Sequence, residues 1–232
     1  AAFPKMTERI GQGRPDLFRS ELQSVIRVII WLSMPVAAVT FFTRGYLVNF
    51  IKNGGDALMA GLLGSLVIAI LFRSVYYICA RSFYEQQDTK TPLYISLFAI
   101  GLNVVLAIWF TMSLNMGAYG LGYAQSIVSV FEVFILFAVM NTRIKGLINK
   151  EVIGAIGRMF IATVVASITC YVMVQLFQLQ GNDASLLATL PKFILIVLVS
   201  GSAYLVSSRL LALREADPII HRLDRIFFGR AR

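Results

Sequence analysis

Six long apolar segments, separated by short polar breaks, dominate the hydrophobic pattern of the chain. An α-helix needs about 20 mostly apolar residues to cross the roughly 30 Å hydrocarbon core of a bilayer, and each segment reaches that length. Stretches such as LLGSLVIAILF do not alternate apolar and polar residues, which argues against the strands of a membrane barrel. The pattern therefore predicts an all-α, polytopic membrane protein with six transmembrane helices: 26–46, 57–79, 93–114, 118–140, 152–177 and 190–211.

The polar stretches divide the chain into four regions. Residues 1–25 are expected to form a cytoplasmic and interfacial lead-in helix that opens at Pro15. Residues 26–142 hold four predicted spans, and residues 152–211 hold two more. The tail, residues 212–232, places apolar residues at helical spacing opposite arginines, which is typical of a basic amphipathic helix on anionic lipid. We expect this tail to anchor the last span at the cytoplasmic surface.

Composition and charge support this organisation and add an orientation. The chain is 58% hydrophobic and only 14% charged, whereas a soluble domain carries about 25% charged residues, so a water-soluble globule is excluded. The net charge of +9 does not indicate nucleic-acid binding, because the basic residues cluster between apolar runs instead of forming one stripe. Only Arg44, Lys52 and Lys192, of 21 basic residues, fall on one side of the predicted membrane. The positive-inside rule then places both termini in the cytoplasm.

The sequence offers no catalytic constellation. Its one histidine, His221, lies outside the predicted spans without ligand-spaced neighbours, and Cys79 and Cys170 lack the spacing of a metal site or a disulfide framework. We therefore expect no catalytic residue, no metal and no cofactor. Enzyme functions are disfavoured.

Two ionisable residues lie inside the predicted spans. Arg73 precedes Arg81 by eight residues, about 12 Å along a helix, and Glu132 precedes Arg143 by eleven, about 16 Å. Charges in hydrocarbon are costly and tend to face a partner or an aqueous cavity. Two interpretations stay open and do not exclude each other: an ion pair that fastens the second span to the fourth, or a charged lining for a polar substrate or coupling ion.

Further polar and small residues are candidates for packing or for the cavity. Arg27 stands at the mouth of the first span, where it meets phosphate headgroups or lines a cavity. Asn103 and Gln125 are intramembrane amides suited to hydrogen bonds between helices. Pro35 kinks the first span, either around a cavity or as a tolerated structural feature. Small residues that permit close helix approach open the fourth span: Gly117, Gly120 and Gly122.

The second connection, FYEQQDTKTP, is the most distinctive local sequence. Thr91 is expected to cap the third helix with Pro92 at its first position, and Asp88 suits a tight turn. The segment reads as a short cytoplasmic elbow, whose characteristic residues are Phe83, Tyr84, Asp88, Thr89, Lys90, Thr91 and Pro92.

At this elbow the chain resembles the MurJ/MviN family of bacterial lipid II flippases, within the multidrug, oligosaccharidyl-lipid and polysaccharide exporter superfamily. The resemblance continues through the glycine-rich opening of the fourth span and the segment Phe3-Pro4-Lys5, and it includes Arg27 and Pro35. It covers essentially the whole chain. The chain departs from the family pattern at Glu132, where relatives place an uncharged polar residue, and at Arg73, which matches no family motif.

The resemblance implies two helical lobes that face each other across a cationic cavity, followed by two helices that form a groove for an isoprenoid tail. The six spans would be the later part of the second lobe plus those two helices, so the chain is expected to be a C-terminal fragment that lacks its N-terminal lobe. The implied activity is translocation of the undecaprenyl-linked peptidoglycan precursor, lipid II, across the bacterial inner membrane by alternating access. Alternatives are an exporter of other lipid-linked oligosaccharides or drugs, and a non-transporting membrane scaffold for envelope assembly.

Overall fold

The computed structural model describes residues 15–52, 55–144, 146–179 and 186–217. Within these ranges the chain is helical and has no strand, which confirms the all-α prediction. The elements are α2 (Pro15–Phe42), α3 (Arg44–Ile51), α4 (Ala57–Glu85), α5 (Lys90–Ile108), the π-helical turn η1 (Trp109–Ser113), α6 (Ala118–Arg143), α7 (Lys150–Leu176) and α8 (Leu186–Leu210).

Six of the described helices are long and apolar enough to cross a membrane, as predicted. Most helix bounds differ from the predicted spans by a few residues, most clearly at the first span and at α4, which continues to Glu85. The first helix ends at Phe42 and a separate short helix, α3, follows, because Thr43 leaves the helical conformation and turns its hydroxyl onto the Val39 carbonyl at 2.7 Å. At its other end, α2 begins at Pro15 and continues into the first span without a break, passing through Pro35.

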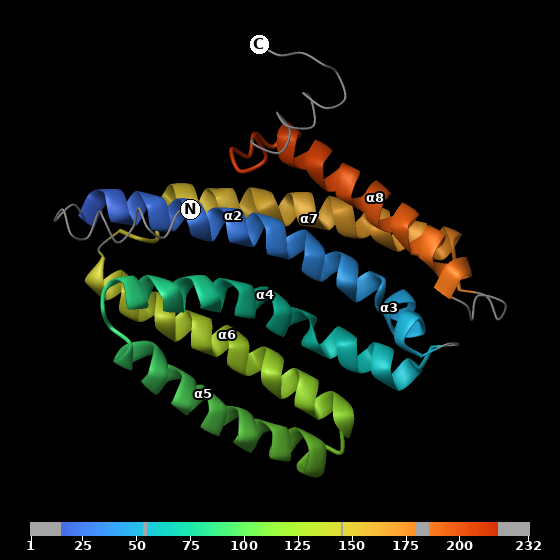
Figure 1. Cartoon of the computed structure of the whole chain (residues 1–232), viewed down its shortest axis with the longest axis horizontal. Coiled ribbons are helices and arrows are strands. Elements are labelled where there is room, and N and C mark those ends of the chain that lie inside the picture. The colour runs from blue at the N-terminus through green and yellow to red at the C-terminus, as the bar shows by residue number, and fades with distance from the viewer. Residues whose placement is uncertain (1–14, 53–54, 145, 180–185, 218–232) are drawn as a thin grey trace.

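The helices form two groups that meet along α2 and α4 (Figure 1). One group contains α2, α7 and α8, and the other contains α4, α5 and α6. Within the second group α6 lies between α4 and α5, so α6 is the most buried of the described spans and α5 the least. This arrangement makes the α4–α6 group a small bundle with polar side chains at its centre.

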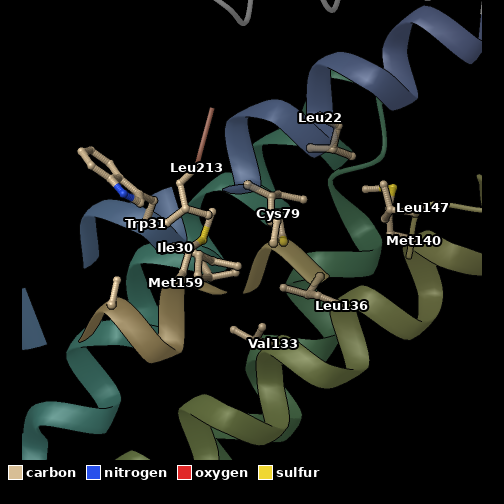
Figure 2. Close-up of a cluster of buried hydrophobic side chains, with 14 of the residues drawn as sticks. Leu22, Ile30, Trp31, Cys79, Val133, Leu136, Met140, Leu147, Met159 and Leu213 are labelled. Atoms are coloured by element: carbon tan, nitrogen blue, oxygen red, sulfur yellow. The ribbon is translucent and has the colours of Figure 1, made fainter. Parts of the chain in front are cut away.

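The main apolar core lies where α2, α4, α6 and α7 meet. Figure 2 shows Ile30, Cys79, Leu136 and Met159 reaching into this space from the four helices. The contribution of α7 is a stripe of mostly small, fully buried residues at helical spacing: Ala155, Met159, Ala162, Ala166 and Cys170. Small side chains let helix backbones approach closely, and van der Waals contact at such approaches drives helix association in membranes.

The glycines at the start of α6 have two different roles. A Cβ at Gly122 would lie 1.8 Å from Ser65 Oγ on α4, and one at Gly120 would lie 2.9 Å from the backbone of Phe110 in η1. The expected close approach is therefore confirmed at these two positions. Gly117 has no neighbour within 4 Å of such an atom, but its φ of +56° favours glycine.

Candidate functional site

A polar cavity of about 190 Å³ lies among α4, α5 and α6. Its polar lining combines Arg73 from α4, Ser96 and Asn103 from α5, and Gln125 and Glu132 from α6. Ser96 and Asn103 are seven residues apart on α5, and Gln125 and Glu132 are seven residues apart on α6. Seven residues are about two helical turns, so the two members of each pair face the same way. The structure thus brings four of the five candidate residues, all except Arg27, around one space.

The predicted ion pair between the second and fourth spans is present. Arg73 Nη1 lies 3.1 Å from Glu132 Oε2. The two partners differ in environment, because the Glu132 side chain is 1% exposed whereas that of Arg73 is 35% exposed. The acid is therefore held inside the bundle, and the guanidinium carries the positive charge to the cavity.

Two hydroxyl groups support the buried carboxylate. Ser96 Oγ donates a hydrogen bond to Glu132 Oε1 at 2.9 Å, and Tyr76 OH lies 2.6 Å from Ser96 Oγ. Because the Ser96 proton goes to Glu132, Tyr76 donates to Ser96. The ring of Tyr76 also lies 5.4 Å from the Arg73 guanidinium carbon, in a cation–π contact. Sequence reasoning missed Tyr76 and Ser96, although Tyr76 follows Arg73 by three residues and therefore shares its helix face.

The two intramembrane amides form a bond between helices, as expected of each, and they form it with each other. Asn103 Nδ2 donates to Gln125 Oε1 at 2.9 Å, which joins α5 to α6. Gln125 Nε2 in turn lies 3.5 Å from Ser129 Oγ. The pair lines the cavity about two turns away from the residues around the ion pair.

Arg27 lies elsewhere. Its Nε is 2.5 Å from Glu215 Oε1, in the segment that follows α8, and the Glu215 side chain is only 6% exposed. The same helices are joined by a hydrogen bond from Trp31 Nε1 to Ser208 Oγ and by one from Tyr204 OH to the Trp31 carbonyl. Arg27 therefore fastens α2 to the end of α8 and does not line the polar cavity.

The start of α5 at the elbow differs from the prediction. The Thr91 cap and the placement of Pro92 at the first helical position are wrong, because α5 begins at Lys90 and the carboxylate of Asp88 caps it. Asp88 Oδ1 accepts hydrogen bonds from the backbone N–H groups of Lys90 and Thr91, at 3.1 and 3.0 Å. Pro92 still falls in the first turn, where a backbone N–H has no partner within the helix.

A second contact ties the elbow to the end of α6. Asp88 Oδ2 accepts from Thr91 Oγ1 and from Arg143 Nη2, both at 2.6 Å. Arg143 also lies over the ring of the buried Phe83, 5.1 Å from its centre. The hydrogen bonds from Thr91, and then the Arg143 charge, hold the pKa of Asp88 well below its usual range. The elbow is thus a structural junction of α4, α5 and α6.

Some sequence-based features fall outside the described residues. These are the Phe3-Pro4-Lys5 segment, His221 and the basic amphipathic stretch from residue 218 onward.

Comparison with known proteins places the chain in a family. The family model described as lipid II flippase MurJ matches residues 1–192. The chain is also 24% identical over 147 residues to a protein of Borreliella burgdorferi named probable lipid II flippase MurJ. That match covers 61% of this chain and 29% of the relative, so the chain matches less than a third of the relative's length. Since the family model spans well over half of the residues, the chain belongs to the lipid II flippase MurJ family.

Proposed function

We propose that these helices are part of a flippase that moves undecaprenyl-linked peptidoglycan precursor, lipid II, from the cytoplasmic to the outer leaflet of a bacterial inner membrane. Membership of the MurJ family supports this activity. The observation that carries it is the polar cavity between α4, α5 and α6, where the partly exposed guanidinium of Arg73, paired with Glu132, faces the other polar side chains of the lining. An intramembrane ionisable group at a cavity marks a path for polar cargo.

The chemistry of the cargo fits two separate surfaces. A phosphate-bearing headgroup needs cationic and hydrogen-bonding side chains, which Arg73, Asn103 and Gln125 supply. The hydrocarbon tail can stay against apolar surface. A second pocket, of about 310 Å³, lies between α2, α4, α6 and α7 and has only hydrophobic residues in its lining, among them Met34 and Phe137.

The whole protein would work by alternating access. In this proposal the described helices rock against a further N-terminal lobe, and the movement exposes the bound headgroup to one side of the membrane and then the other. The 29% coverage of the relative supports such a larger assembly. Both termini of the chain would face the cytoplasm, where the basic tail contacts anionic lipid. The energy would come from an ion gradient or the membrane potential.

Depletion of the protein in cells tests the proposal. We expect lipid II to accumulate in the inner leaflet, and an Arg73→Gln variant to restore the outer-leaflet pool poorly compared with wild type. Arg73→Lys keeps the charge and is expected to restore more. Arg81→Gln, which removes a charge outside the cavity on the same helix, is the matched control. An unchanged leaflet distribution on depletion would refute the assignment.

Two other outcomes would point to the alternative functions. Altered drug resistance without accumulation of precursor would indicate a drug exporter. Normal growth with both Arg73 and Glu132 replaced, in protein shown to be folded, would indicate a scaffold.

A further inference from the structure

A second polar pocket lies at the end of the bundle opposite the elbow, where α2 passes into α3 and where α4 and α6 begin (Figure 1). Its volume is about 720 Å³. This lies within the roughly 300–1,000 Å³ typical of ligand pockets. Its polar side chains are Arg44, Asn115, Tyr119, Tyr123 and Ser65, and the Ser65 hydroxyl already donates to the Leu62 carbonyl. No described residue lines both this pocket and the cavity that contains Arg73, so the two spaces are separate.

Arg44 has no carboxylate partner in the part of the chain that the structure describes. Its Nη1 donates to the Phe41 carbonyl at 2.8 Å, and its guanidinium carbon lies 4.4 Å from the centre of the Phe41 ring. A guanidinium has five N–H donors, so donors remain for a ligand. Acidic partners hold three other arginines in the described helices: Arg27, Arg73 and Arg143. The uncompensated charge of Arg44 favours an anion.

The wall of the pocket on α4 includes two glycines that leave room for the polar side chains. A Cβ at Gly61 would lie 2.4 Å from Cε1 of the Tyr119 ring, and one at Gly64 would lie 3.2 Å from Cδ of Arg44. Tyr119 and Arg44 therefore lie against the helix backbone itself. Larger residues at either glycine would displace them.

The pocket is polar at one end and apolar at the other. Arg44 follows Phe42, the last residue of the first span, and so lies at the level of the headgroups. On α4 the lining runs inward from Gly61 to Ile68, about 10 Å along the helix, and ends among apolar side chains. Tyrosines are common at this boundary between headgroups and hydrocarbon. Such a gradient along the membrane normal matches an amphipathic ligand with its anionic group outward.

We propose that this pocket binds the phosphate of an anionic lipid. Arg44 bonds the phosphate oxygens, the Tyr119 and Tyr123 hydroxyls bond the polar part of the headgroup, and the first part of the hydrocarbon chain lies along Ile68. The phosphate has two sources, a glycerophospholipid of the bilayer or an undecaprenyl pyrophosphate carrier. Binding here does not depend on translocation, so the site can be tested separately from the proposed function.

Native mass spectrometry of the full chain, released from phosphatidylcholine nanodiscs, measures the binding. One sample contains phosphatidylglycerol as the probe and another contains undecaprenyl pyrophosphate. Arg44→Gln removes the cation, and Gly61→Leu fills the pocket while keeping the charge. Lys52→Gln is the matched control, because it removes one positive charge at the same end of the bundle but outside the pocket lining.

We expect Arg44→Gln to weaken retention of the bound lipid by about tenfold or more, as for a charge-assisted hydrogen bond lost from a ligand. Gly61→Leu should weaken it comparably, which keeps the test valid if Arg44→Gln does not fold. Lys52→Gln should change it less than about twofold, as for an exposed charge. The probe that shows the Arg44 dependence identifies the source of the phosphate. Equal retention by wild type and both pocket variants, or an equal loss in Lys52→Gln, would overturn the proposal.

Discussion

At the scale of single residues, ionised side chains in this chain are held by several contacts each. Asp88 accepts two backbone N–H groups, the Thr91 hydroxyl and the Arg143 guanidinium, and Glu132 accepts from Ser96 while it pairs with Arg73. At Asp88 these donors favour the charged form and lower its pKa. Both acids join two or more helices, so loss of either charge is felt beyond its own helix.

The first prediction concerns Asp88→Asn. The amide oxygen can still accept N–H groups but cannot pair with Arg143, so the melting temperature in detergent should fall. The pKa of Asp88 lies below its ordinary value of 3.8, so its stabilising effect is fully present above that pH and is lost as the pH falls toward the lower folded value. The difference in melting temperature between wild type and variant should therefore shrink on acidification below about pH 4.

A matched control is Asn149→Ala, which removes the neutral cap of α7, where Asn149 Oδ1 accepts from the Val152 N–H. It should lower the melting temperature without this acid dependence. A gap for Asp88→Asn that widened on acidification would contradict the first prediction.

The second prediction concerns the buried ion pair. Glu132→Gln leaves Arg73 without its counter-charge, and we expect it to destabilise the folded protein by about 1–3 kcal/mol in thermal unfolding. The double variant Arg73→Gln with Glu132→Gln should recover much of the loss, because two amides can bond to each other. Additive losses in the double variant would show that the two residues are not coupled.

At the scale of helices, small residues decide which faces pack. The α7 stripe is fully buried although it consists largely of alanine, whereas several branched residues of the same helix, such as Ile161 and Val165, stay exposed. Hydrophobicity does not decide which face of α7 is buried, because lipid is as apolar as leucine. Side-chain size decides it, since only the face with small residues lets α7 approach its neighbours closely.

The third prediction tests this face. Ala162→Leu inserts three carbons where the exposed fraction is 0%, and should destabilise the fold by about 1–3 kcal/mol or prevent its accumulation in the membrane. Val165→Leu adds only one carbon, on the exposed face of α7, and should be nearly neutral. The comparison uses thermal unfolding of both purified variants. Equal effects would mean that the buried stripe does not set the packing.

At the scale of the whole molecule, the helices must cross the membrane in one orientation. The 18 to 3 division of basic residues predicts that the η1–α6 turn faces outward and that the end of α6 faces the cytoplasm. Both native cysteines, Cys79 and Cys170, are buried. A thiol reagent should therefore react little with the native cysteines, so that labelling reports on introduced cysteines.

The fourth prediction uses the low reactivity of the native cysteines. A thiol reagent that does not cross the inner membrane should label Ser113→Cys in intact cells. It should label Thr142→Cys only after the cells are permeabilised. Both positions are exposed at opposite ends of the membrane spans. Labelling in the reverse order would invert the topology.

Much of this architecture could be predicted because it depends on local pattern. A span requires a run of about 20 apolar residues, which hydropathy records directly. The Arg73–Glu132 pair could be predicted because two opposite charges deep in neighbouring spans have few other partners. The sequence also indicates that Asn103 and Gln125 bond between helices, but it does not indicate that they bond to each other.

Other features depend on information that one segment does not contain. The Arg27–Glu215 pair joins residues far apart in the chain, so no local pattern indicates it. Whether Asp88 or Thr91 caps α5 depends on the backbone conformation of the few residues between them, which the sequence pattern does not specify. The break at Thr43, by contrast, falls beside Arg44 and Gly45, inside the range predicted for the first span, so the sequence carried a polar signal there that the predicted range passed over.

The π-helical turn η1 has a consequence for how α5 meets α6. Its widened turn, closed by the bond from the Leu114 N–H to the Trp109 carbonyl, holds one residue more than the α-helical turn it replaces. Deleting one residue from this turn would restore α-helical closure and rotate the residues that follow by about 100° around the helix axis. The close approach of Gly120 to the backbone of Phe110 therefore depends on the extra residue.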